Sequence, residues 1–164
     1  MNCKNWYLLA CVVGLLGIGN PAHAHSLCEG LRIILADARN SFSSLRLEFN
    51  FLMDEYRGKV TLGPLDECAT SSDKGVAEYQ CKKEGLPDDE NYVKAELLRL
   101  ESEMQKCLGN DIKRKRGSQT RVTYEYLPSN DELSLQYGRI VPRKGSRPPF
   151  YYLAINVTLV DLNR

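Results

Sequence analysis

The densest group of charged side chains in this sequence is the basic run Lys-Arg-Lys-Arg at positions 113–116. A second basic group, which includes Arg143 and Arg147, follows closer to the C-terminus. Arginine forms forked hydrogen bonds with carboxylates and phosphates, so both segments favour an anionic partner. Nucleic acid is not expected as that partner, because aromatic side chains do not alternate with the basic ones.

Charge is distributed unevenly along the chain. Residues 25–108 contain 16 acidic and 11 basic side chains, a net charge of −5, whereas residues 109–164 contain 5 acidic and 10 basic ones, a net charge of +5. A surface with one sign of charge attracts partners of the opposite sign and accelerates their association. We therefore expect the C-terminal part to bind an acidic partner, provided that its two basic segments lie on one surface.

The histidine content argues against the common forms of catalysis. The sequence has two histidines, His23 and His25, which lie at the expected cleavage site described below. A Ser-His-Asp triad, a histidine acid or base and a histidine-bound metal are therefore not expected in the folded domain. Two acidic pairs, at positions 54–55 and 66–67, lie in expected loops, where solvated carboxylates are common. We expect neither an enzyme nor a metal or cofactor site.

The first 24 residues have the features of a secretory signal peptide. Lys4 supplies a positive charge, residues 7–18 are apolar apart from glycines, and Ala22 and Ala24 form an A-x-A-type cleavage site. The apolar run is shorter than the ~20 residues that a membrane-spanning helix needs. We expect cleavage after position 24, a single mature domain over residues 25–164, and a periplasmic or secreted location. No transmembrane segment is expected after removal of the signal.

The cysteines agree with export. Two of the six lie in the expected signal peptide, where lipidation of the second is a weaker alternative to clean cleavage. The other four form an even set, as is usual in an oxidising compartment, and allow three pairings. The expected packing favours Cys28–Cys107 and Cys68–Cys81. The first pair lies at the meeting ends of two antiparallel helices, and the second flanks a turn at residues 71–75.

Two segments have the pattern of amphipathic helices. In residues 87–109, acidic residues begin the helix, Gly109 ends it, and one face carries the apolar side chains. The residues on that face are Val93, Leu97, Leu100, Met104 and Cys107. The other helix is expected over residues 27–40, where Ser26 and Glu29 form a capping box.

Six segments show the alternation of apolar and polar residues that is typical of strands with one buried face. They cover residues 45–53, 60–62, 77–81, 122–126, 133–137 and 151–159. The last has one apolar face and a second face that is only partly polar, which indicates a central strand or a face covered by a partner. Residues 110–120 show no alternation and are expected to form a basic loop.

These elements predict an α+β fold, organised as a two-layer sandwich with two disulfides. One antiparallel sheet of about six strands is expected to carry both helices on one face. The expected order is α-β-β-β-α-β-β-β, a helix-then-meander unit used twice.

Together, these features predict a non-enzymatic exported protein-binding domain, such as an inhibitor, an immunity-type protein or an assembly factor. Arginine and tyrosine contribute much of the energy of protein interfaces. The residues expected to contact an acidic protein partner are therefore Arg114, Arg116, Arg143, Arg147 and Tyr152. The alternative is a domain that binds a small or polymeric anionic ligand of the cell envelope, such as lipid headgroups or polysaccharide.

Overall fold

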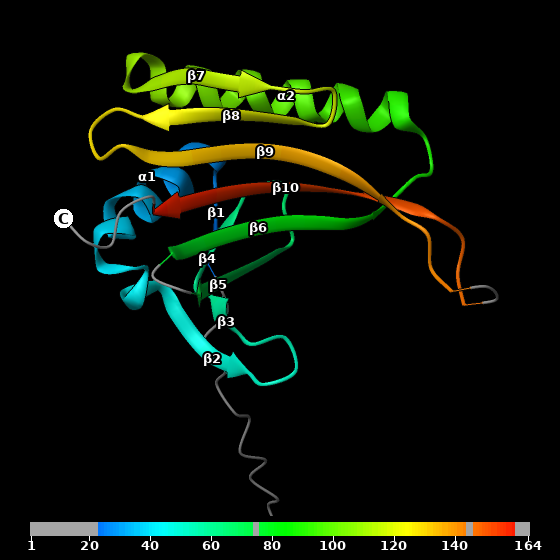
Figure 1. Ribbon diagram of the computed structural model, residues 1–164, viewed down its shortest axis with the longest axis horizontal. Helices are drawn as coiled ribbons and strands as arrows, with labels where there is room; N and C mark the ends of the chain where they lie inside the picture. Colours follow the sequence, from blue (N-terminus) through cyan, green and yellow to red (C-terminus); the bar gives the residue numbers. More distant parts are fainter. Residues whose placement is uncertain (1–22, 74–75, 144–145, 160–164) are drawn as a thin grey trace, which may run out of the picture.

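The computed structural model describes residues 23–73, 76–143 and 146–159. In this part of the chain, two helices lie on one face of an eight-stranded antiparallel sheet, and the opposite face carries no helix (Figure 1). The predicted α+β class is confirmed, but the sheet has eight strands rather than about six. Residues 1–22 of the expected signal peptide lie outside the described residues.

The first half of the fold begins with α1 (Leu27–Asp37), where the Glu29 N–H donates to the Ser26 hydroxyl at 3.3 Å, as the capping box predicts. The helix ends earlier than expected because the chain continues as short 3-10 turns at 38–40 and 43–45. The strands that follow are β2 (Arg46–Asn50), β3 (Glu55–Gly58), β4 (Val60–Leu62), β5 (Glu67–Asp73) and β6 (Val76–Leu86).

The second half begins with α2 (Glu90–Leu108), which confirms the predicted central helix. The Asp89 carboxylate accepts hydrogen bonds from the Asn91 and Tyr92 N–H groups at 3.0 and 3.2 Å, and Gly109 ends the helix at a φ of 53°. The predicted stripe faces the core, with Val93, Leu97, Leu100 and Met104 buried. The strands that follow are β7 (Ile112–Gly117), β8 (Arg121–Tyr126), β9 (Asp131–Ile140) and β10 (Phe150–Leu159).

The strand order in the sheet is β2-β3-β5-β6-β10-β9-β8-β7. Each half therefore supplies one helix and a four-stranded meander, and the last strands of the two meanders, β6 and β10, pair at the centre. This position confirms the expected central strand, whose second face is only partly polar and buries Ala154 and Asn156. Strand β4 lies outside the large sheet and pairs in parallel with β1 (His23–His25).

The predicted order of three strands after each helix is wrong, because five strands follow α1 and four follow α2. No strand was predicted at β3, β5 or β7, whose residues were expected to form turns or loops. Alternation marks a strand only when one of its faces enters the core, and β7 is exposed on both faces apart from the half-buried Ile112. Strand β3 has the sequence Glu-Tyr-Arg-Gly, in which only Tyr56 is apolar, so it shows no repeat of apolar residues.

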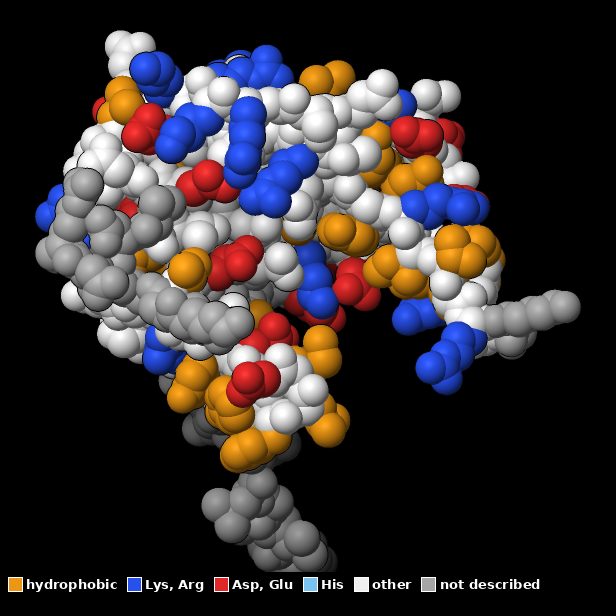
Figure 2. All heavy atoms as spheres, in the orientation of Figure 1, with side chains coloured by type: hydrophobic (Ala, Val, Ile, Leu, Met, Phe, Trp, Pro, Cys, Tyr) orange, Lys and Arg blue, Asp and Glu red, His pale blue; other side chains and the backbone are white. Residues whose placement is uncertain are grey.

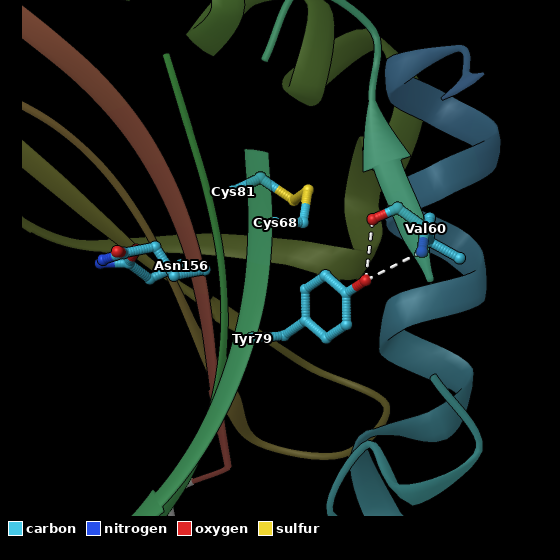
Figure 3. The surroundings of a disulfide bond; sticks show 6 residues. Val60, Cys68, Tyr79, Cys81 and Asn156 are labelled. Carbon is cyan, nitrogen blue, oxygen red and sulfur yellow. Dashed lines mark hydrogen bonds between the residues drawn. A yellow bond between two sulfur atoms is a disulfide. The ribbon is translucent and has the colours of Figure 1, made fainter. Parts of the chain in front are cut away.

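Both predicted disulfides are present. Cys28–Cys107 links the start of α1 to the end of α2, with 5.3 Å between the Cα atoms, and Cys68–Cys81 links paired positions of β5 and β6 at 4.1 Å. Beside the second bridge, the buried Tyr79 hydroxyl donates to the Val60 carbonyl at 2.7 Å (Figure 3). It also accepts from the Val60 N–H at 3.0 Å, so Tyr79 ties β4 to the sheet.

Within residues 23–73, 76–143 and 146–159, no helix is both long and apolar enough to span a bilayer.

Candidate binding surfaces

The basic run at 113–116 forms β7, the edge strand of the sheet on the side of α2 (Figure 1). The expectation of a loop here is wrong. The side chains of Arg114 and Arg116 are 62% and 74% exposed. Within the part of the chain that the structure describes, β7 pairs with β8 on one side only, so its other side presents unpaired backbone donors and acceptors together with the basic side chains.

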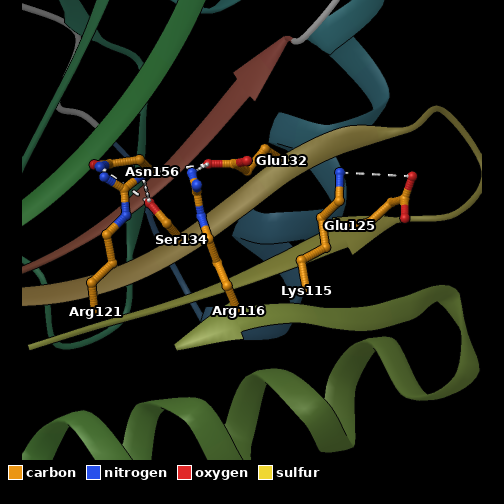
Figure 4. Close-up of polar contacts among 7 residues, drawn as sticks. All are labelled: Lys115, Arg116, Arg121, Glu125, Glu132, Ser134 and Asn156. Atoms are coloured by element: carbon orange, nitrogen blue, oxygen red, sulfur yellow. Dashed lines mark hydrogen bonds and ion pairs between the residues drawn. The ribbon is translucent and has the colours of Figure 1, made fainter. Parts of the chain in front are cut away.

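The charges of β7 are only loosely compensated. Arg114 lies 4.0 Å from Glu101 on α2, whereas Lys115 lies 4.0 Å from Glu125 on the opposite face of the sheet. Arg116 is 3.9 Å from Glu132 (Figure 4). Exposed ion pairs at such distances contribute at most about 1 kcal/mol. The basic side chains therefore remain available to a partner.

A row of polar side chains crosses the helix-free face beside β7. The Arg121 guanidinium donates to the Ser134 hydroxyl at 3.1 Å, and the Asn156 amide donates to the same oxygen at 3.4 Å (Figure 4). Gln80 then donates to the Asn156 carbonyl oxygen at 3.0 Å. Ser134 and Asn156 are buried and hydrogen-bonded, so this row holds the sheet face together.

The second basic group lies elsewhere. Arg143 and Arg147 belong to the loop between β9 and β10, which Figure 1 places at the far right, whereas β7 runs along the top of the molecule. The Arg147 guanidinium lies 4.6 Å from the centre of the ring of Phe150, the first residue of β10, in a cation–π contact. The two basic segments therefore form separate surfaces, not the single surface that the sequence analysis required.

Tyr152, the remaining expected contact residue, lies on the helix-free face of β10 and is half-buried. Its ring packs on Gly138 of β9, where a Cβ atom would lie 2.5 Å from the Tyr152 ring. Tyr152 therefore has a packing role that explains its presence without a partner.

Comparison with known proteins does not assign a family. The chain matches no family model, curated protein or solved structure. Its chemistry must be inferred from its own surfaces. Among the described residues, no three histidine, cysteine or acidic side chains are grouped so that they could hold a metal ion.

One exposed apolar surface was missed by the sequence analysis. Residues 51–53 were expected to continue a half-buried strand, but they form the turn between β2 and β3. Phe51, Leu52 and Met53 are 87%, 95% and 59% exposed. Their alternation continues that of β2 without a break, so no local signal in the sequence marks the point where the core ends.

A cleft of about 470 Å³ opens beside this turn. Its lining includes the carboxylates of Glu55, Asp66 and Glu67 and the cations Arg57 and Lys82. Lys82 lies 3.0 Å from Glu84 and 3.9 Å from Glu67. The hydrogen bond with Glu84 is the main cause that raises the pKa of Lys82, so this lysine stays charged and is not a nucleophile.

Proposed function

We propose that this chain is an exported, non-enzymatic protein-binding domain that binds an acidic protein along the edge strand β7. The observation that carries the proposal is the presence of four consecutive basic residues on a free sheet edge. An extended segment of the partner could pair with the β7 backbone while its carboxylates meet the basic side chains. Charge complementarity of this kind gives specificity and a fast association rate.

The placement of the β7 side chains supports recognition from two sides. Arg114 lies 4.0 Å from Glu101 of α2. Lys115 and Arg116 instead point toward Glu125 and Glu132 on the helix-free face (Figure 4). A partner strand beside β7 would therefore meet basic groups on both of its faces. Two disulfides are typical of exported proteins, and together with the signal-like N-terminus they support a periplasmic or secreted location.

Basic residues on an edge strand also have a protective role, because they prevent pairing between the edges of identical sheets. This role and partner binding make different demands. Protection requires only a charge at the edge, so an acidic β7 would serve equally well. Binding of an acidic partner requires the positive sign.

The test is affinity capture from the envelope fraction at low and high salt, with mass spectrometry of the retained proteins. We expect one stoichiometric acidic protein that elutes as the salt concentration rises. The double variant Arg114→Glu/Arg116→Glu should lose most of this capture while remaining folded and monomeric.

The matched control is Arg143→Glu/Arg147→Glu, which changes the same number of charges on the separate loop. This control should capture the partner as well as the unchanged protein does. Equal capture by the β7 variant would contradict the proposal. Salt-sensitive retention of lipid or polysaccharide without a protein would instead support the alternative anionic ligand of the cell envelope.

A further inference from the structure

The turn between β2 and β3 is an apolar protrusion held in place by aromatic contacts. The ring centre of Phe49 lies 4.9 Å from that of Phe51 and 4.8 Å from that of Tyr56. These contacts brace the exposed turn at Phe51, Leu52 and Met53, rather than bury it. Contiguous apolar residues at such exposure commonly mark an interaction site.

The protrusion has an acidic surround. Residues 48–55 contain three carboxylates, those of Glu48, Asp54 and Glu55, and no basic side chain. Glu48 is paired with Arg57 at 2.6 Å. Asp54 and Glu55 have no ion pair with any residue that the structure describes, although the charge of Glu55 is among the causes that raise the pKa of Lys82.

The cleft adjoins this protrusion directly. Asn50 and Glu55, which flank the turn and pair across the hairpin, both line it. Asp66 adds a further carboxylate to its lining without an ion pair in the described part of the chain, whereas Lys82 is already held by two acids. The space beside the apolar turn is therefore suited to a cationic group. Figure 2 shows orange and red side chains side by side at the lower end of the molecule.

We propose that the apolar turn at residues 51–53 and the acidic cleft beside it form one docking site for a partner segment in which apolar side chains alternate with lysine or arginine. The apolar side chains cover Phe51 and Leu52, and a cationic side chain enters the cleft toward Glu55 and Asp66. This site uses residues other than β7 and requires the opposite charge in its partner, so it goes beyond the proposed function.

The charges distinguish this occupant from a lipid surface. An apolar tip that enters an anionic membrane is usually accompanied by lysine or arginine, which bind the headgroups. Here the residues directly after the tip are Asp54 and Glu55. Their carboxylates would be repelled by anionic headgroups, but they complement a basic peptide.

The test is titration of the purified, oxidised, ¹⁵N-labelled protein with three blocked hexapeptides, followed by NMR. The first alternates lysine with leucine, the second glutamate with leucine, and the third lysine with serine. We expect the lysine–leucine peptide to shift signals of residues 50–57, 66–69 and 80–82. The other two peptides should bind at least about ten-fold more weakly, a difference of about 1.4 kcal/mol.

Variants separate the two parts of the site. Leu52→Ser should weaken binding of the lysine–leucine peptide by about ten-fold, whereas Leu98→Ser, at an exposed leucine on α2, should leave it unchanged. The double variant Glu55→Gln/Asp66→Asn should weaken binding and reduce its salt dependence. The control is Asp111→Asn, which removes a carboxylate directly before β7. It should leave binding of this peptide unchanged.

Three results would overturn the assignment. One is the absence of binding by the lysine–leucine peptide, and another is equal binding of the glutamate–leucine peptide. The third is a Leu52-dependent association with something else, either phosphatidylglycerol vesicles or a second copy of the chain detected by sedimentation. None of these results tests binding at β7, so they neither support nor contradict the proposed function.

Discussion

The two edges of the sheet differ in almost every respect that matters for binding. At one edge, β7 is a basic strand that packs beside β8 and close to α2. At the other edge, β2 is a short strand that leads into the apolar turn at residues 51–53 with carboxylates beside it. Each edge belongs to one half of the chain, and the two halves carry net charges of opposite sign.

This difference shows that one architecture can present unrelated surfaces. Each half builds a helix and a four-stranded meander, and the two meanders join through β6 and β10 in the centre. The core residues determine this arrangement, whereas the outermost strands β2 and β7 each pair with one neighbour and present different surfaces. Some of the following variants change contacts in the core of the two halves, and others change the edges that distinguish the halves. They run from the largest expected loss of stability to the smallest.

The largest loss of stability is expected from removal of the disulfide that links the two halves. Replacing both Cys28 and Cys107 by alanine opens a closure of 79 residues and should lower the free energy of unfolding by about 4–5 kcal/mol. Replacing Cys68 and Cys81, which are 13 residues apart, should cost about 3 kcal/mol. Urea unfolding of the two double variants measures the difference. A larger loss from the shorter closure would contradict the dependence on loop length.

The next largest loss of stability is expected from removal of the Tyr79 hydroxyl, which anchors β4 in the first half. Tyr79→Phe leaves the buried Val60 N–H and carbonyl without their partner and should cost about 1–3 kcal/mol. The matched change in the second half, Tyr124→Phe, removes a hydroxyl that contacts side chains of α2 and leaves no backbone group unpaired. It should cost less in the same unfolding measurement, and an equal or greater loss would contradict this contrast.

Alkaline pH should destabilise both halves through these same tyrosines. Burial is the main cause that raises the pKa of Tyr79 and that of Tyr124 to about 12 in the folded protein. In the unfolded chain a tyrosine has a pKa of about 10. The unfolded state therefore loses its protons first, and stability should fall as the pH rises from about 10 toward about 12. Unfolding at a series of pH values measures this loss, which Tyr79→Phe should reduce. A pH profile unchanged by that variant would exclude Tyr79 as a cause.

The smallest effects on stability are expected at the edges themselves. Leu52→Ser and Arg116→Ser change exposed side chains and should each alter the free energy of unfolding by no more than about 0.5 kcal/mol. The two variants should nevertheless affect different partners, the first a basic peptide and the second an acidic protein. A stability loss well above that value would show that the edge residue supports the fold.

The sequence predicted those elements whose pattern reflects burial. The stripe on α2 and the alternation in β8, β9 and β10 arise because a face enters the core. The cap at Ser26 was predicted because the first N–H groups of a helix need an acceptor. The disulfide pairing followed from the packing of the helices and from the spacing around one turn. These features depend on local periodicity and on a simple topology.

The edges could not be predicted in the same way. Strand β7 has no alternation because both of its faces meet solvent, and it resembles a basic loop in the sequence. Phe51 and Met53 continue the alternation of β2, although the sheet below them has ended. Whether Arg143 lies near Arg116 depends on the strand order of the whole sheet, which no local pattern contains.

Hydrogen exchange of the protein in complex with its captured acidic partner tests the central proposal most directly. The backbone amides of β7 that face away from β8 should become protected over residues 112–117. The β9–β10 loop and the turn at residues 51–53 should exchange as they do in the free protein. Protection of either of those regions with no change in β7 would contradict the assignment of the acidic partner to this edge.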